Sequence, residues 1–174
     1  MNKNTGFTLV EMIITIAVMA IVSTIGVPSF NDVILSSYAV THTNDFLSSL
    51  NLARSEAIKR GQRVVVCKSL NNICQASLPG WEQGWMVFVD SNNTALLDSN
   101  EFPLRVHGPL KGGDTLRGNQ NVSSYISYSP DGTTKLKSGA FQAGTLTFGL
   151  CVHHKKNEIV ISSSGRARLK KEPC

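Results

Sequence analysis

The residues of this 174-residue chain with the clearest binding chemistry are basic side chains near its C-terminus. Residues 150–174 hold six Lys and Arg against two Asp and Glu, and they contribute +4 of the net charge of +5. In an extended segment, alternate side chains project on one side about 6.5 to 7 Å apart. That distance is close to two steps of about 3.4 Å along one nucleic-acid strand. We therefore predict contacts to phosphates from Arg166, Arg168, Lys170 and Lys171, with Lys155 and Lys156 widening the patch.

This basic tail is expected to bind double-stranded DNA through charge. Arginine suits the task because its planar guanidinium bonds phosphate oxygens in pairs. Residues 149–174 contain no Phe, Tyr or Trp, so stacking on bases is not supported and binding should be salt-sensitive and independent of sequence. We expect Gly165 to free the tail from the preceding strand, and we place Lys155 and Lys156 in the turn before that strand. A solvated tail without a partner is the alternative.

A second group of basic residues lies where a long helix is predicted to end. It consists of Lys59, Arg60 and Arg63. Nothing in the sequence places these three side chains on the same face as the basic tail.

Signals for an enzyme are poor. The chain has no HExxH, P-loop or GxGxxG pattern, and its serines lack the context of a nucleophile elbow. We therefore predict a protein that is not an enzyme and needs no cofactor. Trp81 and Trp85 flank a turn and could bind a sugar or a nucleobase, but packing in the core is the favoured role for such large aromatic side chains. Surface or packing roles are also favoured for the four histidines, His42, His107, His153 and His154.

The four cysteines predict disulfide bonds. All of them follow the apolar N-terminal segment, where export would place them in an oxidising compartment. Three pairings are possible, and we favour Cys67 with Cys74 and Cys151 with Cys174 because each pair closes a local loop. The longer loop should contribute roughly 3 to 4 kcal/mol of stability. A metal site built from Cys151, His153 and His154 is disfavoured, because this spacing matches no closed zinc pattern.

The elements that must position these residues are one long helix followed by strands. A helical pattern continues beyond Pro28 to Arg60, and Gly61 follows as its C-terminal cap. Phe46, Leu50, Ala53 and Ala57 form an apolar stripe that should dock on a sheet. The predicted α+β fold is a long N-terminal helix packed on an antiparallel, β-sandwich-like head. About six strands are predicted, at residues 62–68, 84–90, 102–107, 122–129, 144–152 and 158–163.

The N-terminal segment has a charge pattern of its own. Residues 7–27 carry one charged side chain, Glu11, and as a helix they would span roughly 30 Å, enough to cross a membrane once. An uncleaved secretory signal or a simple anchor is the plain interpretation. Against it, Gly6 and Phe7 lie before the apolar run, and a lone carboxylate within a membrane is costly. Favourable placement of Glu11 in the first helical turn is the local explanation for that residue.

Residues 3–11, KNTGFTLVE, resemble the class III signal of type IV pilins and pseudopilins. The resemblance implies that a prepilin peptidase cuts between Gly6 and Phe7 and that the new amino group of Phe7 is methylated. It also implies that Glu11 meets the N-terminal ammonium of a neighbouring subunit. The chain would then divide into a leader (1–6), a transmembrane or filament-core helix (7–27), an amphipathic continuation (28–61) and a β-rich head (62–174).

Four further segments are similar to FimT/GspH-type minor pilins and pseudopilins. They are ARSEAIKRGQRVVVC, GWEQGWMVFVD, SPDGT and IVISSSGRAR. The resemblance implies a low-abundance subunit that assembles with other pilins, anchored in the inner membrane with a periplasmic head before it joins a pilus at the cell surface. The leading hypothesis is a minor type IV pilin that binds extracellular DNA for uptake in natural transformation. The alternative is a structural pseudopilin of type II secretion that binds no DNA, in which Arg166 serves folding or filament contacts.

Overall fold

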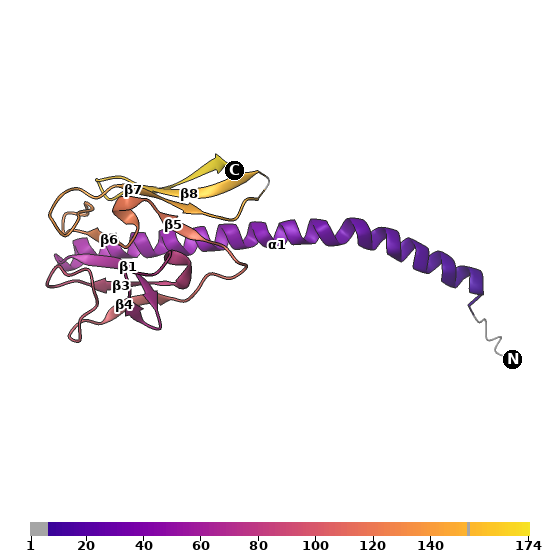
Figure 1. Cartoon of the computed structure of the whole chain (residues 1–174), viewed down its shortest axis with the longest axis horizontal. Coiled ribbons are helices and arrows are strands. Elements are labelled where there is room, and N and C mark those ends of the chain that lie inside the picture. The colour runs from indigo at the N-terminus through magenta and orange to yellow at the C-terminus, as the bar shows by residue number, and fades with distance from the viewer. Residues whose placement is uncertain (1–6, 153) are drawn as a thin grey trace.

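A single helix, α1 (Leu9–Arg60), runs the whole length of the molecule in the computed structural model, which describes residues 7–152 and 154–174, without the side chains of residues 25–29. Thr8 caps its N-terminus, and Gly61, at φ 62° and ψ 26°, follows its last residue in the left-handed conformation. The helix therefore ends at Arg60, as predicted. Figure 1 shows α1 as a rod that bends in its N-terminal half and carries the head at its other end.

The N-terminal half of α1 is a bare apolar stem. From Leu9 to Val22, the large apolar side chains are all more than half exposed. Within the residues that the structure describes, no helix is both long enough and apolar enough to cross a membrane. The membrane span predicted for residues 7–27 is therefore not confirmed, and it stays a prediction.

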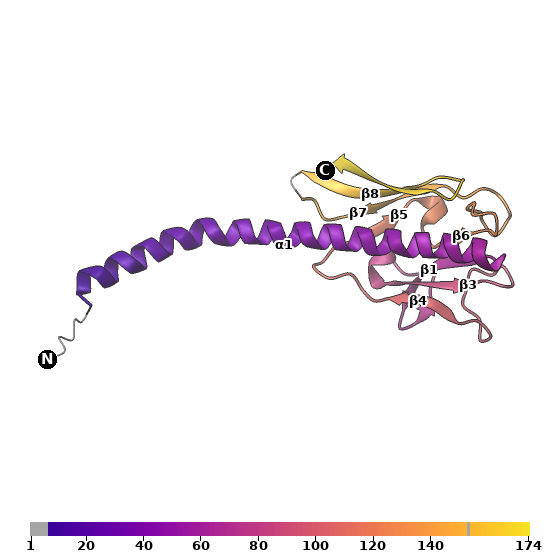
Figure 2. The ribbon, with the colours of Figure 1, turned by 180° about the vertical axis from the view of Figure 1, so that it is seen from behind.

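The C-terminal half of α1 packs on both sheets of the head. Phe46, Leu50, Ala53 and Ala57 are fully buried, which confirms the predicted stripe. Figure 2 shows the helix lying across the head, with one sheet above it and the other below. The buried residues of α1 therefore share one hydrophobic core with residues of both sheets.

The first sheet is antiparallel and has the order β2-β1-β3-β4, with β6 on the other side of β1 from β3. Its strands are β1 (Val64–Leu70), β2 (Ile73–Cys74), β3 (Trp85–Val89), β4 (Pro103–His107) and β6 (Tyr125–Tyr128). Both faces of β1 are buried: Val64 and Val66 join the main core, and Val65 and Cys67 join a smaller one. This explains the continuous apolar run in its sequence.

The second sheet is also antiparallel and has the order β5-β7-β8-β9. Its strands are β5 (Leu116–Gly118), β7 (Gly144–Phe148), β8 (Lys155–Ile161) and β9 (Ala167–Pro173). Two short 3₁₀ helices lie between strands: η1 (Trp81–Gln83) between β2 and β3 of the first sheet, and η2 (Gln120–Val122) between β5 of the second sheet and β6 of the first. The α+β class and the two antiparallel sheets packed on the helix are as predicted.

The two tryptophans fill the space between helix and sheets. Both are fully buried, and each ring packs edge-on against Phe46, with ring centroids 5.2 Å away for Trp81 and 5.0 Å for Trp85. Their indole N–H groups donate to the Val122 carbonyl (3.0 Å) and the Ser49 hydroxyl (2.9 Å). Neither ring faces solvent, so the packing role is confirmed and ligand stacking is excluded.

The strand prediction is wrong in number and in three boundaries. The described residues form nine strands, and the prediction misses β2 and β5, which have two and three residues, and β9. The strand predicted at 122–129 begins only after η2, and that predicted at 144–152 ends at Phe148. The strand predicted at 158–163 begins three residues earlier, so Lys155 and Lys156 lie in β8 and not in a turn.

Candidate functional site

The predicted basic tail is a strand. Residues 167–173 form β9, whose seven residues all pair with β8, from Ala167 opposite Ile161 to Pro173 opposite Lys155. The expectation that Gly165 frees this segment is wrong. Gly165, at φ 78°, donates its N–H to the Ser162 carbonyl (2.9 Å) in a tight turn that returns the chain onto β8. The basic residues are thus held on a sheet.

The register of β8 and β9 decides which basic side chains share a face. Residues directly opposite one another in an antiparallel pair lie on the same side of the sheet. Ile159 and Ile161 are buried against the core, so their partners Leu169 and Ala167 lie on the inner face. The outer face then holds Arg168, Lys170 and Glu172 from β9 and Lys156 and Glu158 from β8, with Arg166 next to them at the turn. We call Arg166, Arg168, Lys170 and Lys156 the outer basic face.

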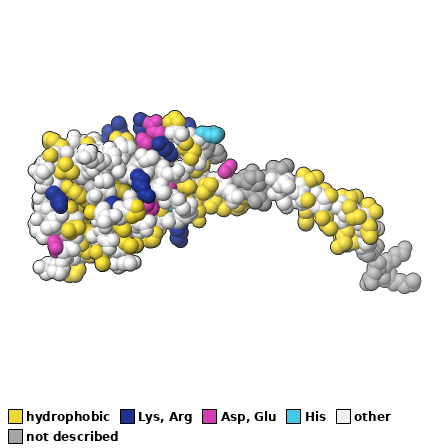
Figure 3. All heavy atoms as spheres, in the orientation of Figure 1, with side chains coloured by type: hydrophobic (Ala, Val, Ile, Leu, Met, Phe, Trp, Pro, Cys, Tyr) yellow, Lys and Arg dark blue, Asp and Glu magenta, His cyan; other side chains and the backbone are white. Residues whose placement is uncertain are grey.

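Two carboxylates neutralise part of the positive charge of the outer basic face. Glu158 lies 3.8 Å from the Lys156 ammonium, and Glu172 pairs with Lys170. The hydrogen bond that the Lys170 ammonium donates to the Glu172 carboxylate raises the pKa of Lys170, which keeps this pair charged. Figure 3 shows acidic and basic side chains next to each other along the upper edge of the head. The prediction overlooked this neutralisation, although Lys-x-Glu at 156–158 and 170–172 places each pair on one face of a strand.

Two guanidinium groups on this face keep an accessible positive charge. Arg166 and Arg168 are exposed, and among the described residues neither forms an ion pair. They are two positions apart, Arg166 directly before β9 and Arg168 within it, which corresponds to about 6.5 to 7 Å along an extended chain. The chemistry that this pair suits best is bonding to two phosphate groups on one backbone.

Lys155 and Lys171 do not join this face. Lys171 pairs with Asn157, whose side chain donates to the Ala39 carbonyl of α1 (3.2 Å), so both belong to the inner side of the sheet. Lys155 and Lys171 line a cavity of about 130 Å³ where the stem enters the head. The structure therefore splits the six predicted residues between two faces.

The turn that carries Arg166 is anchored to the rest of the head. Arg54 of α1 donates from Nε to the Gly132 carbonyl (3.1 Å) and from Nη2 to the Ser164 carbonyl (3.0 Å). Thr134 bonds the turn from another loop, through its N–H to the Ser163 carbonyl (3.1 Å). Nothing in the sequence indicates this role for Arg54, which directly follows Ala53 of the apolar stripe.

The basic residues at the end of α1 do not add to the site. Arg63 is mostly buried, with its Nε 3.1 Å from the Asp90 carboxylate, and this burial lowers the pKa of Arg63. Arg60 pairs with Glu56 one turn back on the helix. Lys59 is exposed. The three residues therefore offer no joint binding surface.

The predicted processing and assembly residues lie at the N-terminal end of the stem. Gly6 is outside the described residues, whereas Phe7 is 84% exposed. Glu11 forms a capping box with Thr8: its carboxylate accepts from the Thr8 N–H (3.1 Å) and hydroxyl (3.0 Å). In a single chain, Glu11 thus serves the local role of satisfying the helix N-terminus.

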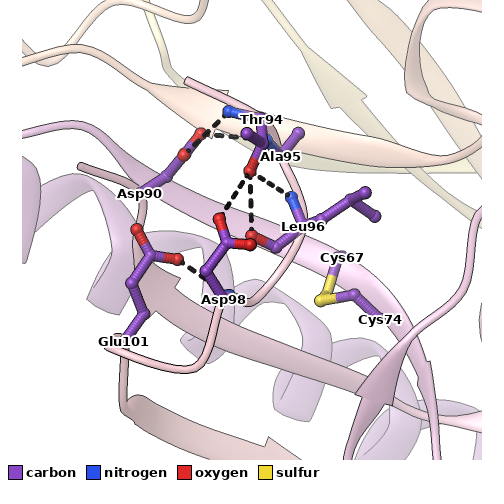
Figure 4. The surroundings of a disulfide bond; sticks show 8 residues. All are labelled: Cys67, Cys74, Asp90, Thr94, Ala95, Leu96, Asp98 and Glu101. Atoms are coloured by element: carbon purple, nitrogen blue, oxygen red, sulfur yellow. Dashed lines mark hydrogen bonds between the residues drawn. A yellow bond between two sulfur atoms is a disulfide. The ribbon is translucent and has the colours of Figure 1, made fainter. Parts of the chain in front are cut away.

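Both disulfides join the predicted pairs. Cys151–Cys174 ties the end of β9 to the segment before β8, and the Cys174 N–H donates to the His154 carbonyl (3.1 Å). Cys67–Cys74 links β1 to β2 beneath the loop that follows β3 (Figure 4).

The acidic residues of that loop are bonded to the loop itself. Asp90 accepts from the N–H groups of Thr94 (3.1 Å) and Ala95 (3.2 Å), and Glu101 accepts from the Asp98 N–H (3.3 Å), as Figure 4 shows. Among the described residues, no group of three or more His, Cys, Asp or Glu is arranged to hold a metal ion. His153, one member of the disfavoured metal site, lies outside them, and Cys151 is in a disulfide.

Two other histidines connect α1 to the head. His42 is buried with Nδ1 3.2 Å from the Asp114 carboxylate, which also accepts from the Leu150 N–H (2.9 Å). His107 stacks on Trp85 with ring centroids 3.9 Å apart and lies 3.4 Å from Asp45. Both contact the core or a carboxylate of the described residues, in agreement with the predicted packing role.

Comparison with known proteins yields two family matches. Residues 42–165 match the family described as type II transport protein GspH, and residues 1–27 match the prokaryotic N-terminal methylation motif. No curated protein matches significantly in sequence.

Solved structures share the fold. The type IV minor pilin FimU of Pseudomonas aeruginosa matches with a TM-score of 0.55 and 20% identity, covering 78% of this chain and 87% of FimU. The minor pseudopilin EpsH from the type 2 secretion system of Vibrio cholerae matches with a TM-score of 0.51 and 15% identity, covering 76% of this chain and 95% of EpsH. These likenesses agree with the helix and the two sheets described above, and the GspH match spans well over half of the chain. The chain therefore belongs to the GspH family of minor pilins and pseudopilins.

Proposed function

We propose that this chain is a minor subunit of a type IV filament whose head binds double-stranded DNA, for uptake in natural transformation. The observation that carries the proposal is the pair Arg166 and Arg168, two exposed guanidinium groups without an acidic partner among the described residues. Arg166 directly precedes β9, and Arg168 lies on its outer face. Bonds from this pair to backbone phosphates would be independent of base sequence. Lys170 and Lys156 lie on the same face and would contribute less, because each is paired with a glutamate.

The stem supports assembly into a filament. A surface of exposed apolar side chains from Leu9 to Val22 needs a membrane or other helices to cover it. In the proposal, residues 7–27 anchor the subunit in the inner membrane with its head in the periplasm. After the prepilin peptidase has removed residues 1–6 and Phe7 has been methylated, the same segment packs in the filament core. The two disulfides fit a head that leaves the cytoplasm.

A structural pseudopilin of a type II secretion system is the second candidate. The observation that favours it is the neutralisation of the outer basic face by Glu158 and Glu172, which leaves a smaller positive surface than the sequence suggests. In that case Arg166 and Arg168 would contact other subunits or exported proteins.

Binding of DNA as a function of salt separates the two candidates. The oxidised full chain, purified in detergent micelles, would be titrated with fluorescent duplexes of two unrelated sequences between about 20 and 200 mM salt. We expect both duplexes to bind equally, with a Kd of roughly 10⁻⁴ to 10⁻⁶ M that weakens steeply as salt rises. No binding at the lowest salt concentration would reject the DNA hypothesis and leave the pseudopilin role.

Removing the two glutamates of the outer face should strengthen DNA binding. In the variant Glu158→Gln with Glu172→Gln, Lys156 and Lys170 lose their acidic partners and two negative charges leave the surface. We expect an affinity about 3- to 10-fold higher at low salt, and a smaller gain at high salt. Asp32→Asn with Glu56→Gln changes the net charge equally but lies on α1, and it should bind like the wild type. Equal gains in both variants would mean that net charge alone governs binding.

Replacement of Glu11 by Ala should separate processing from assembly. The substitution removes the carboxylate proposed to meet the Phe7 ammonium of a neighbouring subunit, and it also opens the capping box with Thr8. We expect the variant to be cleaved after Gly6, as measured by intact mass, but to be several-fold depleted in isolated filaments. Thr8→Ala, which breaks the cap and keeps the carboxylate, is the control. Equal depletion of both variants would assign Glu11 the local role alone.

A further inference from the structure

Arg54 occupies a position that the packing of the helix alone does not explain. It lies on α1 beside the buried stripe, yet its guanidinium reaches two loops far apart in the sequence. One acceptor, the Gly132 carbonyl, belongs to the turn after β6, and the other, the Ser164 carbonyl, belongs to the turn between β8 and β9. A single planar group therefore fixes the distance between these two turns.

The two turns meet where Arg54 holds them. A Cβ atom placed on Gly165 would lie 1.9 Å from the Gly132 carbonyl oxygen and 3.3 Å from the ring of Tyr128, so the backbones are in close contact. Thr134 adds bonds from its hydroxyl and its N–H to the Ser162 and Ser163 carbonyls, both at 3.1 Å. The backbone carbonyls of three successive turn residues, Ser162 to Ser164, therefore all accept hydrogen bonds from other parts of the head.

The position of this turn decides where Arg166 lies. Ser164 precedes Arg166 by two residues, and the Ser162 N–H donates to the Arg166 carbonyl (3.0 Å) at the last bonded pair of the hairpin. Because, within the described part of the chain, β9 is an edge strand paired with β8 alone, its end would open easily without such anchors. A shift of the turn would change the separation of the Arg166 and Arg168 guanidinium groups.

We propose that Arg54 is a positioning residue for DNA binding: it clamps the β8–β9 turn to α1 and so sets the spacing of Arg166 and Arg168. This inference rests on the proposed function. In it, α1, the helix proposed to assemble the filament, bonds directly through Arg54 to the β8–β9 turn, which is proposed to contact DNA. Arginine is required because its rigid fork supplies two donors at a fixed separation, whereas the lysine ammonium is a single point.

The test compares variants of the full chain that differ in charge and in geometry. Arg54→Lys keeps the charge and loses the fork, Arg54→Gln loses both, and Lys59→Gln removes an exposed charge from the same helix as a control. We expect about 5- to 10-fold weaker DNA binding in both Arg54 variants and less than about 2-fold in the control. Wild-type affinity in Arg54→Lys would overturn the proposal.

A double-mutant cycle shows whether Arg54 acts through Arg166. In a chain that already carries Arg166→Gln, we expect Arg54→Lys to change the affinity by less than about 2-fold, since the group that it positions is absent. A loss of the same size in both backgrounds would show that Arg54 contacts DNA independently or acts on general stability, and would overturn the positioning role.

Hydrogen exchange of the Gly165 amide tests the clamp without DNA. This N–H donates to the Ser162 carbonyl, and we expect its exchange to be about tenfold faster in Arg54→Lys than in the wild type, with β1 amides unchanged. If the wild type binds no DNA, the proposed function fails and positioning for DNA fails with it, while faster exchange still identifies the clamp. If the wild type binds DNA and exchange is unchanged, only the proposal for Arg54 fails.

Discussion

Substituting Arg166 and Arg168 together by Gln is expected to lower the affinity for DNA about 10- to 100-fold at low salt. Each guanidinium would lose a charge-assisted bond to phosphate, which is worth roughly 1.5 to 3 kcal/mol at most and less at an exposed site. The slope of log K against log salt should fall by about one to two, since about 0.9 of a counterion is released for each phosphate contacted. Glutamine keeps much of the side-chain length and hydrogen-bonding capacity, so the charge is the main change.

The other face of the same hairpin provides the matched control. Lys155→Gln with Lys171→Gln removes two positive charges from β8 and β9 as well, but these side chains lie by the cavity at the stem and not on the outer face. We expect this variant to lose less than about 3-fold in affinity, through long-range charge alone. Fluorescence anisotropy with both variants at several salt concentrations gives the comparison. Equal losses in the two would contradict a localised site and indicate diffuse attraction to a basic head.

The fold and the ion pairs of the outer face support different parts of the functional proposal. The likeness to FimU and EpsH covers most of the chain, and at 20% and 15% identity it establishes the fold. Among the described residues, Lys156 and Lys170 form ion pairs with glutamates, whereas Arg166 and Arg168 form none. The proposal therefore depends on two side chains, and it can be tested with two substitutions.

The helix could be predicted from the sequence because its signals are local. The apolar stripe from Phe46 to Ala57 has helical spacing, and Gly61 supplies the left-handed residue that ends the helix. The buried strands β1 and β3 contain runs of β-branched and aromatic residues, which favour β-strands. The disulfide pairs could also be predicted, because each joins two cysteines that are close in the sequence.

The site could be predicted only in part because it depends on pairing between strands. Four of the seven residues of β9 are charged, a composition that favours a solvated tail, and the strand forms because Ala167 and Leu169 alternate on its inner side. The register with β8, which brings Glu158 opposite Lys170, is set by the turn and by the core contacts of Ile159 and Ile161. A count of charged residues reveals neither the β8–β9 pairing nor its register. The same holds for Arg54, whose two acceptors lie 78 and 110 residues away in the chain.

Gly165 is the residue at which prediction and structure differ most, and its replacement by Ala should have the largest effect on stability. Its φ of 78° already disfavours a side chain, by about 1 to 2 kcal/mol. The added Cβ would also lie 1.9 Å from the Gly132 carbonyl oxygen, so the two turns would have to separate and release the bonds that Arg54 makes to both. Together we expect a loss of roughly 3 to 5 kcal/mol in the free energy of unfolding.

Gly139 offers a control with the same backbone strain and no collision. Its φ is 85°, and a Cβ atom there would have no neighbour within 4 Å. Gly139→Ala should therefore lose only about 1 to 2 kcal/mol, so that the difference between the two variants in urea or thermal unfolding measures the contact between the turns. If both variants lose the same amount, the turn carrying Arg166 is free to move, and the glycine would serve a mobile tail after all. A larger loss in Gly165→Ala, accompanied by weaker DNA binding, would mean that the glycine is needed to hold the basic strand in place.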